Sequence, residues 1–165
     1  LLYLLTGKDD AKIREWFGKL SSEGKYEVSD DIKTLLKEDF YGGCCDDEQT
    51  KETIKRTYEK YSYTLDTHTA VAVKVYEDYK SATGDETRTV IASTASPYKF
   101  SASVLEAIDG KKPEIDEFAM VDRLYEISQY EIPDALASLK NKEIRFSGSV
   151  ESNQMKDFVL KTLGM

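Results

Sequence analysis

Apolar side chains recur at helical spacing along most of the chain, and capping residues or glycines mark where each run begins and ends. The first stripe consists of Ile13, Trp16, Phe17 and Leu20. These residues fall at positions i, i+3, i+4 and i+7, which is the signature of one apolar helix face. The acidic residues 9–10 precede the stripe and Gly24 follows it, as expected at a helix start and a helix end.

The same pattern predicts further helices, and two of them carry distinctive start signals. Asp46 with Gln49 forms a capping-box pattern, in which each side chain bonds the backbone N–H of the other residue. Ser96 followed by Pro97 combines a favoured N-cap with a favoured first helical residue. The predicted helices lie within residues 29–40, 46–61, 66–84, 96–109, 115–129, 133–139 and 152–163. We therefore expect a mostly helical chain.

Two segments break the helical pattern. Residues 87–93 are rich in β-forming side chains and apolar enough for a central parallel strand, and residues 143–147 alternate like an edge strand. Two lone strands cannot form a stable sheet without neighbours. The apolar start, residues 1–5, also resembles the end of an element whose beginning is missing. Both features predict that residues 1–165 are a fragment of a larger α/β protein.

Composition argues against several classes of function. The 165 residues carry a formal net charge of −8, and no basic cluster is visible, so nucleic acid and acidic membrane surfaces are poor partners. No apolar run approaches the roughly 20 residues of a membrane span, and no signal peptide is recognisable. The adjacent Cys44 and Cys45 favour free thiols in a reducing, cytoplasmic compartment. With one histidine in the chain, they do not make a metal-binding set.

Residues 93–100 are the first candidate for chemistry. They combine the end of the predicted strand, a turn rich in Ser and Thr, and a helix start, which is where ligands bind in open α/β sheets. Free N–H groups at the helix start also favour an anion. The alternative is that Ser93, Thr94 and Ser96 only cap the turn and that Lys99 is a solvated surface charge. Spacing alone favours this alternative.

His68 is the only histidine, and it lies in the first turn of the helix predicted at residues 66–84. A lone histidine is more often a hydrogen-bonded structural residue than a general base, so the residues alone favour a structural role. Cys44 and Cys45 precede a helix start that would stabilise a thiolate, but the acidic residues 46–47 oppose this effect. We expect both thiols to be packed or idle.

Two motifs in order resemble the long form of threonine synthase found in bacteria and yeast. That family carries a stretch like DPHTAV, and residues 66–71 read DTHTAV. Further along, the family has a strand that ends in a stretch like STAHPAKF or GTAHPAKF, and residues 93–100 read STASPYKF. The resemblance covers essentially the whole chain and points to the C-terminal portion of the family. Thr67 replaces the usual proline and Ser96 replaces a common histidine, which leaves no imidazole at position 96.

The resemblance implies a pyridoxal-phosphate-dependent lyase of the tryptophan-synthase-β-like fold (fold type II). Such an enzyme converts O-phospho-L-homoserine and water to L-threonine and phosphate. The resemblance also implies that the Thr94 hydroxyl meets the pyridine nitrogen of the cofactor. Asp66, His68, Ser93 and Lys99 match motif positions that border the site.

The same resemblance implies that these residues are inactive alone. In the family, the lysine that forms the internal aldimine lies in an SFKD-like segment, and a Gly/Asn-rich loop binds the cofactor phosphate. Neither occurs in residues 1–165. We therefore expect a single C-terminal fragment with no catalytic residue, no metal and no bound cofactor of its own. Its expected partners are the remainder of the same polypeptide and the small substrate, and self-association of the exposed apolar surface is also expected.

Two other functions stay open on the residues alone. The first is a stand-alone helical protein-interaction module without catalysis, which the unpaired strands and the abrupt apolar start argue against. The second is a hydrolase that uses His68, for which the sequence shows no nucleophile arrangement.

Overall fold

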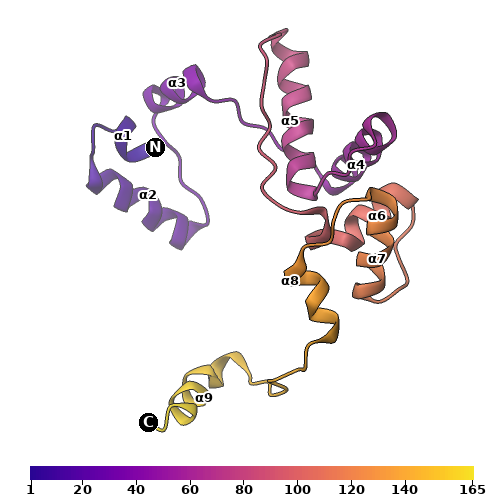
Figure 1. The fold of residues 1–165 in the computed structure, drawn as a ribbon. Helices are drawn as coiled ribbons and strands as arrows, with labels where there is room; N and C mark the ends of the chain where they lie inside the picture. Colours follow the sequence, from indigo (N-terminus) through magenta and orange to yellow (C-terminus); the bar gives the residue numbers. More distant parts are fainter. The chain divides into compact units, whose positions relative to one another are not determined.

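Helices make up all the regular secondary structure of the chain (Figure 1). The computed structural model describes residues 1–165, which divide into two units, Leu1–Pro113 and Glu114–Met165. The first unit contains α1 (Leu2–Leu5), α2 (Asp10–Glu23), α3 (Asp30–Asp39), α4 (Asp47–Tyr61), α5 (Thr67–Thr83), the 3-10 helix η1 (Pro97–Phe100) and α6 (Ser101–Asp109). The predicted helices of this unit are thus confirmed close to their expected bounds. None of the helices is both long enough and apolar enough to cross a membrane.

The beginning of the first unit follows the start and stop signals of the sequence. Asp9 caps α2 by accepting the N–H of Lys12 at 3.0 Å, and Gly24 ends the helix in the left-handed conformation with φ of 74°. Trp16 of α2 is buried and stacks on Tyr26, with ring centroids 6.1 Å apart. This contact holds the loop after α2 against the helix, while α1 contacts both α2 and α3.

Helices α4, α5 and α6 form a packed cluster, because α4 lies against both α5 and α6. Each helix contributes fully buried apolar residues; these include Ile54, Ala70 and Val104. Ion pairs reinforce both contacts at the surface, since Arg56 of α4 pairs with Glu77 of α5, and Lys51 of α4 pairs with Glu106 of α6 at 2.8 Å. This cluster is the scaffold that carries residues 66–71.

The second unit contains α7 (Glu117–Ser128), α8 (Asp134–Ala137), η2 (Ser138–Asn141), η3 (Ser152–Gln154) and α9 (Met155–Thr162). Asp116 caps α7 by accepting the N–H groups of Phe118 and Ala119 at 3.0 and 3.1 Å. Lys140 of η2 pairs with Asp122 of α7 at 2.9 Å. The helices predicted within residues 115–129, 133–139 and 152–163 are therefore confirmed, the last two with 3-10 turns.

The two predicted strands, residues 87–93 and 143–147, are wrong, because neither segment forms a strand. A strand needs a backbone hydrogen-bond ladder with a neighbouring strand, and no other segment of the chain supplies one. The first segment makes local hydrogen bonds instead: Asp85 accepts the Thr87 N–H at 2.8 Å, and the Thr89 hydroxyl donates to the Thr87 carbonyl at 3.1 Å. The chain is mostly helical, as expected, but without the sheet strands.

Residues 85–95 run back along α5 in the opposite direction (Figure 1). Near the end of α5, the Tyr79 hydroxyl donates to the Asp85 carboxylate at 2.6 Å. Near its start, the hydroxyls of Thr69 and Ser93 share a hydrogen bond of 3.1 Å. The segment is therefore attached to α5 at both ends, and it returns the second motif to the helix end where the first motif lies.

Candidate functional site

Asp66 is the N-cap of α5 and is almost completely buried, with 1% of its surface exposed. Its Oδ1 accepts the N–H of His68 at 2.8 Å and the N–H of Thr69 at 3.2 Å. Its Oδ2 accepts a short hydrogen bond from the Thr69 hydroxyl. Because the helix start occupies both oxygens, this carboxylate acts as a cap and stabilises the local backbone.

Thr69 connects the two motifs. Its side chain is buried, and its hydroxyl is hydrogen-bonded both to Asp66 and to Ser93, which lies 24 residues further along the chain. The structure therefore brings together two of the predicted site residues, Asp66 and Ser93, through a third residue that lies between them.

Thr94, the predicted cofactor contact, directly follows Ser93 and is exposed. Two residues further along, the Ser96 Oγ accepts the N–H of Tyr98 at 3.3 Å and so caps η1. Ser96 is thus a structural cap, in agreement with one of the two roles that its sequence position allows. Thr94 therefore lies between two attached residues, Ser93 and Ser96.

His68 and Lys99 both lie next to Phe100. The His68 ring centroid is 4.9 Å from that of Phe100, and Lys99 Nζ is 5.4 Å from the same ring. His68 Nδ1 is 3.7 Å from Asp66 Oδ1, and its side chain is 61% exposed. Asp66, His68 and Lys99 therefore lie near the start of α5, and of the three only Asp66 is buried.

A cavity of about 490 Å³ lies at the starts of α4, α5 and α6. His68 and Phe100 line it together with Cys45, Lys51 and Glu106. The hydrogen bond from Lys51 to Glu106, at 2.8 Å, raises the pKa of Lys51, so this lysine is a firmly held cation. The residues that line this cavity do not include Ser93, Thr94 or Lys99. The cavity is therefore distinct from the predicted cofactor contact at Thr94.

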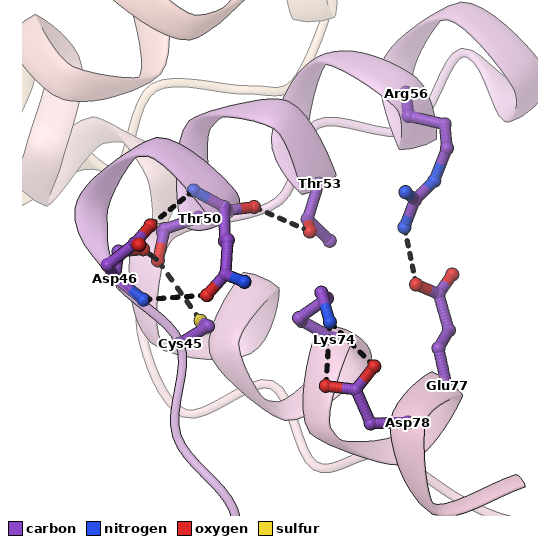
Figure 2. Close-up of polar contacts among 9 residues, drawn as sticks. Cys45, Asp46, Thr50, Thr53, Arg56, Lys74, Glu77 and Asp78 are labelled. Atoms are coloured by element: carbon purple, nitrogen blue, oxygen red, sulfur yellow. Dashed lines mark hydrogen bonds and ion pairs between the residues drawn. The ribbon is translucent and has the colours of Figure 1, made fainter. Parts of the chain in front are cut away.

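Figure 2 shows the polar contacts at the start of α4, next to this cavity. Asp46 accepts the N–H of Gln49 at 2.8 Å, and Gln49 Oε1 accepts the N–H of Asp46 at 3.0 Å, so the predicted capping box is confirmed. Cys45 Sγ lies 3.3 Å from Thr50 Oγ1. Cys44 and Cys45 are both free thiols.

Sequence reasoning missed Thr69, although the residue is part of the first motif. It stands three positions after the N-cap Asp66, which is where a capping-box side chain turns back towards the cap. That spacing is a usable signal for the contact with Asp66. The contact with Ser93 has no local signal, because it depends on how residues 85–95 run along α5.

Comparison with known proteins places these motifs in a family. A family model described as threonine synthase, C-terminal, matches residues 69–159, which is more than half of the chain. The threonine synthase of Methylobacillus glycogenes is 36% identical over 112 residues, or 67% of this chain and 23% of that protein. The threonine synthase of Saccharomyces cerevisiae is 37% identical over 117 residues, or 66% of this chain and 23% of that protein.

A solved structure shows the same fold. The crystal structure of PLP-bound threonine synthase from Brucella melitensis matches with a TM-score of 0.67 and 23% identity, over 96% of this chain and 30% of that one. The chain thus spans less than a third of the length of these relatives. By the match over residues 69–159, the chain belongs to the threonine synthase family and corresponds to its C-terminal region.

Proposed function

We propose that this chain is the C-terminal part of a pyridoxal-phosphate-dependent lyase that converts O-phospho-L-homoserine and water to L-threonine and phosphate. The observation that carries the proposal is the family match over residues 69–159, which includes Thr69, Ser93 and Thr94. Relatives over this region are named threonine synthase, and one solved relative is described as PLP-bound.

The residues present fit this cofactor. A hydroxyl donates a hydrogen bond to a neutral pyridine nitrogen, whereas a carboxylate favours its protonated form. Thr94 carries such a hydroxyl and is an exposed residue, while the carboxylate of the first motif, Asp66, is buried and bonded to the start of α5. When bound, pyridoxal phosphate supplies an electron sink for reactions at the substrate's carbon atoms. Thr94 would hold the ring through its nitrogen.

The remaining predicted residues border the site. Ser93 holds the backbone next to Thr94 through its hydrogen bond with Thr69. His68 presents an exposed ring, and Lys99 presents an exposed ammonium group beside Phe100. Lys99 is our candidate for a contact with the substrate phosphate, because an ammonium donates strong hydrogen bonds to phosphate oxygens.

The lysine that binds the cofactor covalently is proposed to lie outside residues 1–165, since no segment here resembles the one that carries it in the family. The partner of this single C-terminal fragment is then the remainder of the same polypeptide. Val90, Ile144 and Phe146 are 82–91% exposed, so the fragment by itself is expected to self-associate. The free thiols of Cys44 and Cys45 favour the cytoplasm.

An activity assay on the intact protein, meaning the full polypeptide that carries this chain, tests the proposal. With pyridoxal phosphate and O-phospho-L-homoserine, it should release phosphate and form threonine in equal amounts, and residues 1–165 alone should form neither. Phosphate release without threonine would show a different lyase reaction on the same substrate. No reaction by a protein that binds pyridoxal phosphate would refute the substrate assignment.

The role of Thr94 is tested in the same protein. Thr94→Ala should shift the absorption spectrum of the bound cofactor and slow turnover, whereas Thr94→Ser keeps the hydroxyl and should restore both. An unchanged spectrum and rate in Thr94→Ala would remove Thr94 from the cofactor site.

A further inference from the structure

We propose that Thr69 is a positioning residue that acts through Ser93 to fix the place of the Thr94 hydroxyl. The inference rests on the proposed function, because it concerns the cofactor contact assigned to Thr94. Thr69 does not itself touch the cofactor in this proposal. It sets where the residue that does so can lie.

The Thr69 hydroxyl is a rigid point of attachment. Thr69 is 5% exposed, and its hydroxyl is bonded to the Asp66 carboxylate, which is itself bonded to two N–H groups of α5. Hydrogen bonds to a buried carboxylate are stronger than those between neutral groups. The position of the Thr69 oxygen is therefore fixed by the start of the helix.

Ser93 depends on this attachment, because it lies in a segment without helix or strand. The hydrogen bond between Ser93 and Thr69, at 3.1 Å, joins this segment to the start of α5. Consecutive Cα atoms are about 3.8 Å apart, so a displacement of Ser93 is passed almost directly to Thr94. Loss of the Thr69 hydroxyl therefore releases the residue next to the cofactor contact.

The backbone on the other side of Thr94 has a separate attachment. Ser96 caps η1 by accepting the N–H of Tyr98, which is 5% exposed, and the Ser101 hydroxyl donates to the Tyr98 carbonyl at 2.8 Å. This second attachment remains when Thr69 is changed. Thr94 is then held from one side only, which predicts a misplaced hydroxyl and not an unfolded loop.

A structural alternative is that Thr69 only stabilises the start of α5 through Asp66. This alternative predicts a loss of stability without any change at the cofactor. The chain contains a matched control, Thr53 of α4, which is 1% exposed and donates its hydroxyl to the Gln49 carbonyl at 2.8 Å. Thr53→Val removes a buried helical hydroxyl whose hydrogen bond stays within its own helix.

The experiment compares Thr69→Val, Thr69→Ser, Ser93→Ala and Thr53→Val in the intact protein. For each variant, the Kd of pyridoxal phosphate, the absorption maximum of the bound cofactor, and kcat and KM for O-phospho-L-homoserine are measured. Ser93→Ala removes the same hydrogen bond by changing an exposed residue, so it should disturb folding little. It therefore tests the proposal even if Thr69→Val does not fold.

Thr69→Val and Ser93→Ala should each raise the Kd of pyridoxal phosphate by roughly two- to tenfold, the effect of losing one hydrogen bond. Both should shift the cofactor absorption and lower kcat with little change in KM. The double variant Thr69→Val, Ser93→Ala should lose no more than Thr69→Val alone, because the Thr69 change already removes the hydrogen bond to Ser93. Thr69→Ser should restore all values, and Thr53→Val should change none of them.

The outcomes for the two proposals are separable. A parent protein that binds no pyridoxal phosphate refutes the proposed function. A parent protein that binds it and forms threonine, with Ser93→Ala unchanged in spectrum, Kd and kcat, refutes the positioning role alone. Normal cofactor properties in a less stable Thr69→Val protein would show that Thr69 serves only the helix start.

Discussion

At the residue scale, Gly43 shows how closely the loop before α4 approaches α5. A Cβ atom at Gly43 would lie 2.8 Å from Val75 Cγ1, whereas one at Gly42 would meet nothing within 4 Å. Gly43→Ala must displace the loop or Val75, at a cost of about 1–3 kcal/mol, as in other overpacked contacts. Gly42→Ala is the matched control and should be near neutral. Urea unfolding of the intact protein measures both, and equal midpoints for the two variants would contradict the close approach.

The contribution of Asp85 to stability depends on pH, because the pKa of its carboxyl group is strongly lowered in the folded chain. Hydrogen bonds from Thr87 and from the Tyr79 hydroxyl lower its pKa from 3.8 to about 2. Because the folded-state pKa is the lower one, this carboxylate stabilises the attachment of residues 85–95 above its unfolded pKa of 3.8. The stabilisation is lost as the pH falls from 3.8 to about 2.

Tyr79→Phe should therefore raise the pKa of Asp85, but not fully to 3.8, because Thr87 makes the larger contribution. Tyr76→Phe removes a hydroxyl from the same helix and should leave the pKa unchanged. A carboxyl-carbon NMR titration of Asp85 distinguishes the variants. An Asp85 titration that is identical in Tyr79→Phe and the parent protein would show that the hydroxyl does not bind there.

At the scale of the elements, the helix starts are where local sequence decides local structure. Asp46 and Gln49 satisfy each other's backbone N–H groups at the start of α4, as their spacing predicts. Asp46→Ala removes the cap and should cost about 1 kcal/mol. Asp47→Ala, one position later, loses only its interaction with the helix dipole, worth a few tenths of a kcal/mol. Urea unfolding should rank the variants in that order, and the reverse order would contradict the capping box.

Helices and strands differed in how well the sequence predicted them. Caps such as Asp9, Asp46 and Ser96 act on residues at most a few positions away, so a local pattern suffices to find the helix. A strand is completed only by a partner segment, which is why residues 87–93 have β-forming side chains and still form no strand here. Val90, 91% exposed, shows that this segment leaves apolar surface uncovered.

In the candidate site, too, the sequence indicated which residues matter but not their long-range contacts. The motif positions of Asp66, His68, Ser93 and Lys99 led to residues that the structure places around the start of α5 and η1. The sequence did not reveal that Asp66 is fully occupied as a cap, nor that Thr69 links it to Ser93. The link to Ser93 depends on the path of residues 85–95, which is a property of tertiary packing.

At the scale of the whole molecule, the chain supplies one part of the proposed site and lacks another. It belongs to the threonine synthase family and holds the neutral hydroxyl proposed for the cofactor nitrogen. It contains no segment that resembles the family's cofactor-lysine segment. The cofactor contact proposed for Thr94 and the cofactor lysine therefore belong to different regions of the polypeptide.

Borohydride reduction of the intact, pyridoxal-phosphate-loaded protein, followed by peptide mapping, locates the cofactor lysine. The treatment fixes the cofactor onto the lysine that binds it. We expect one modified lysine outside residues 1–165, with Lys99 and every other lysine of this chain unmodified. A modified lysine within residues 1–165 would contradict it.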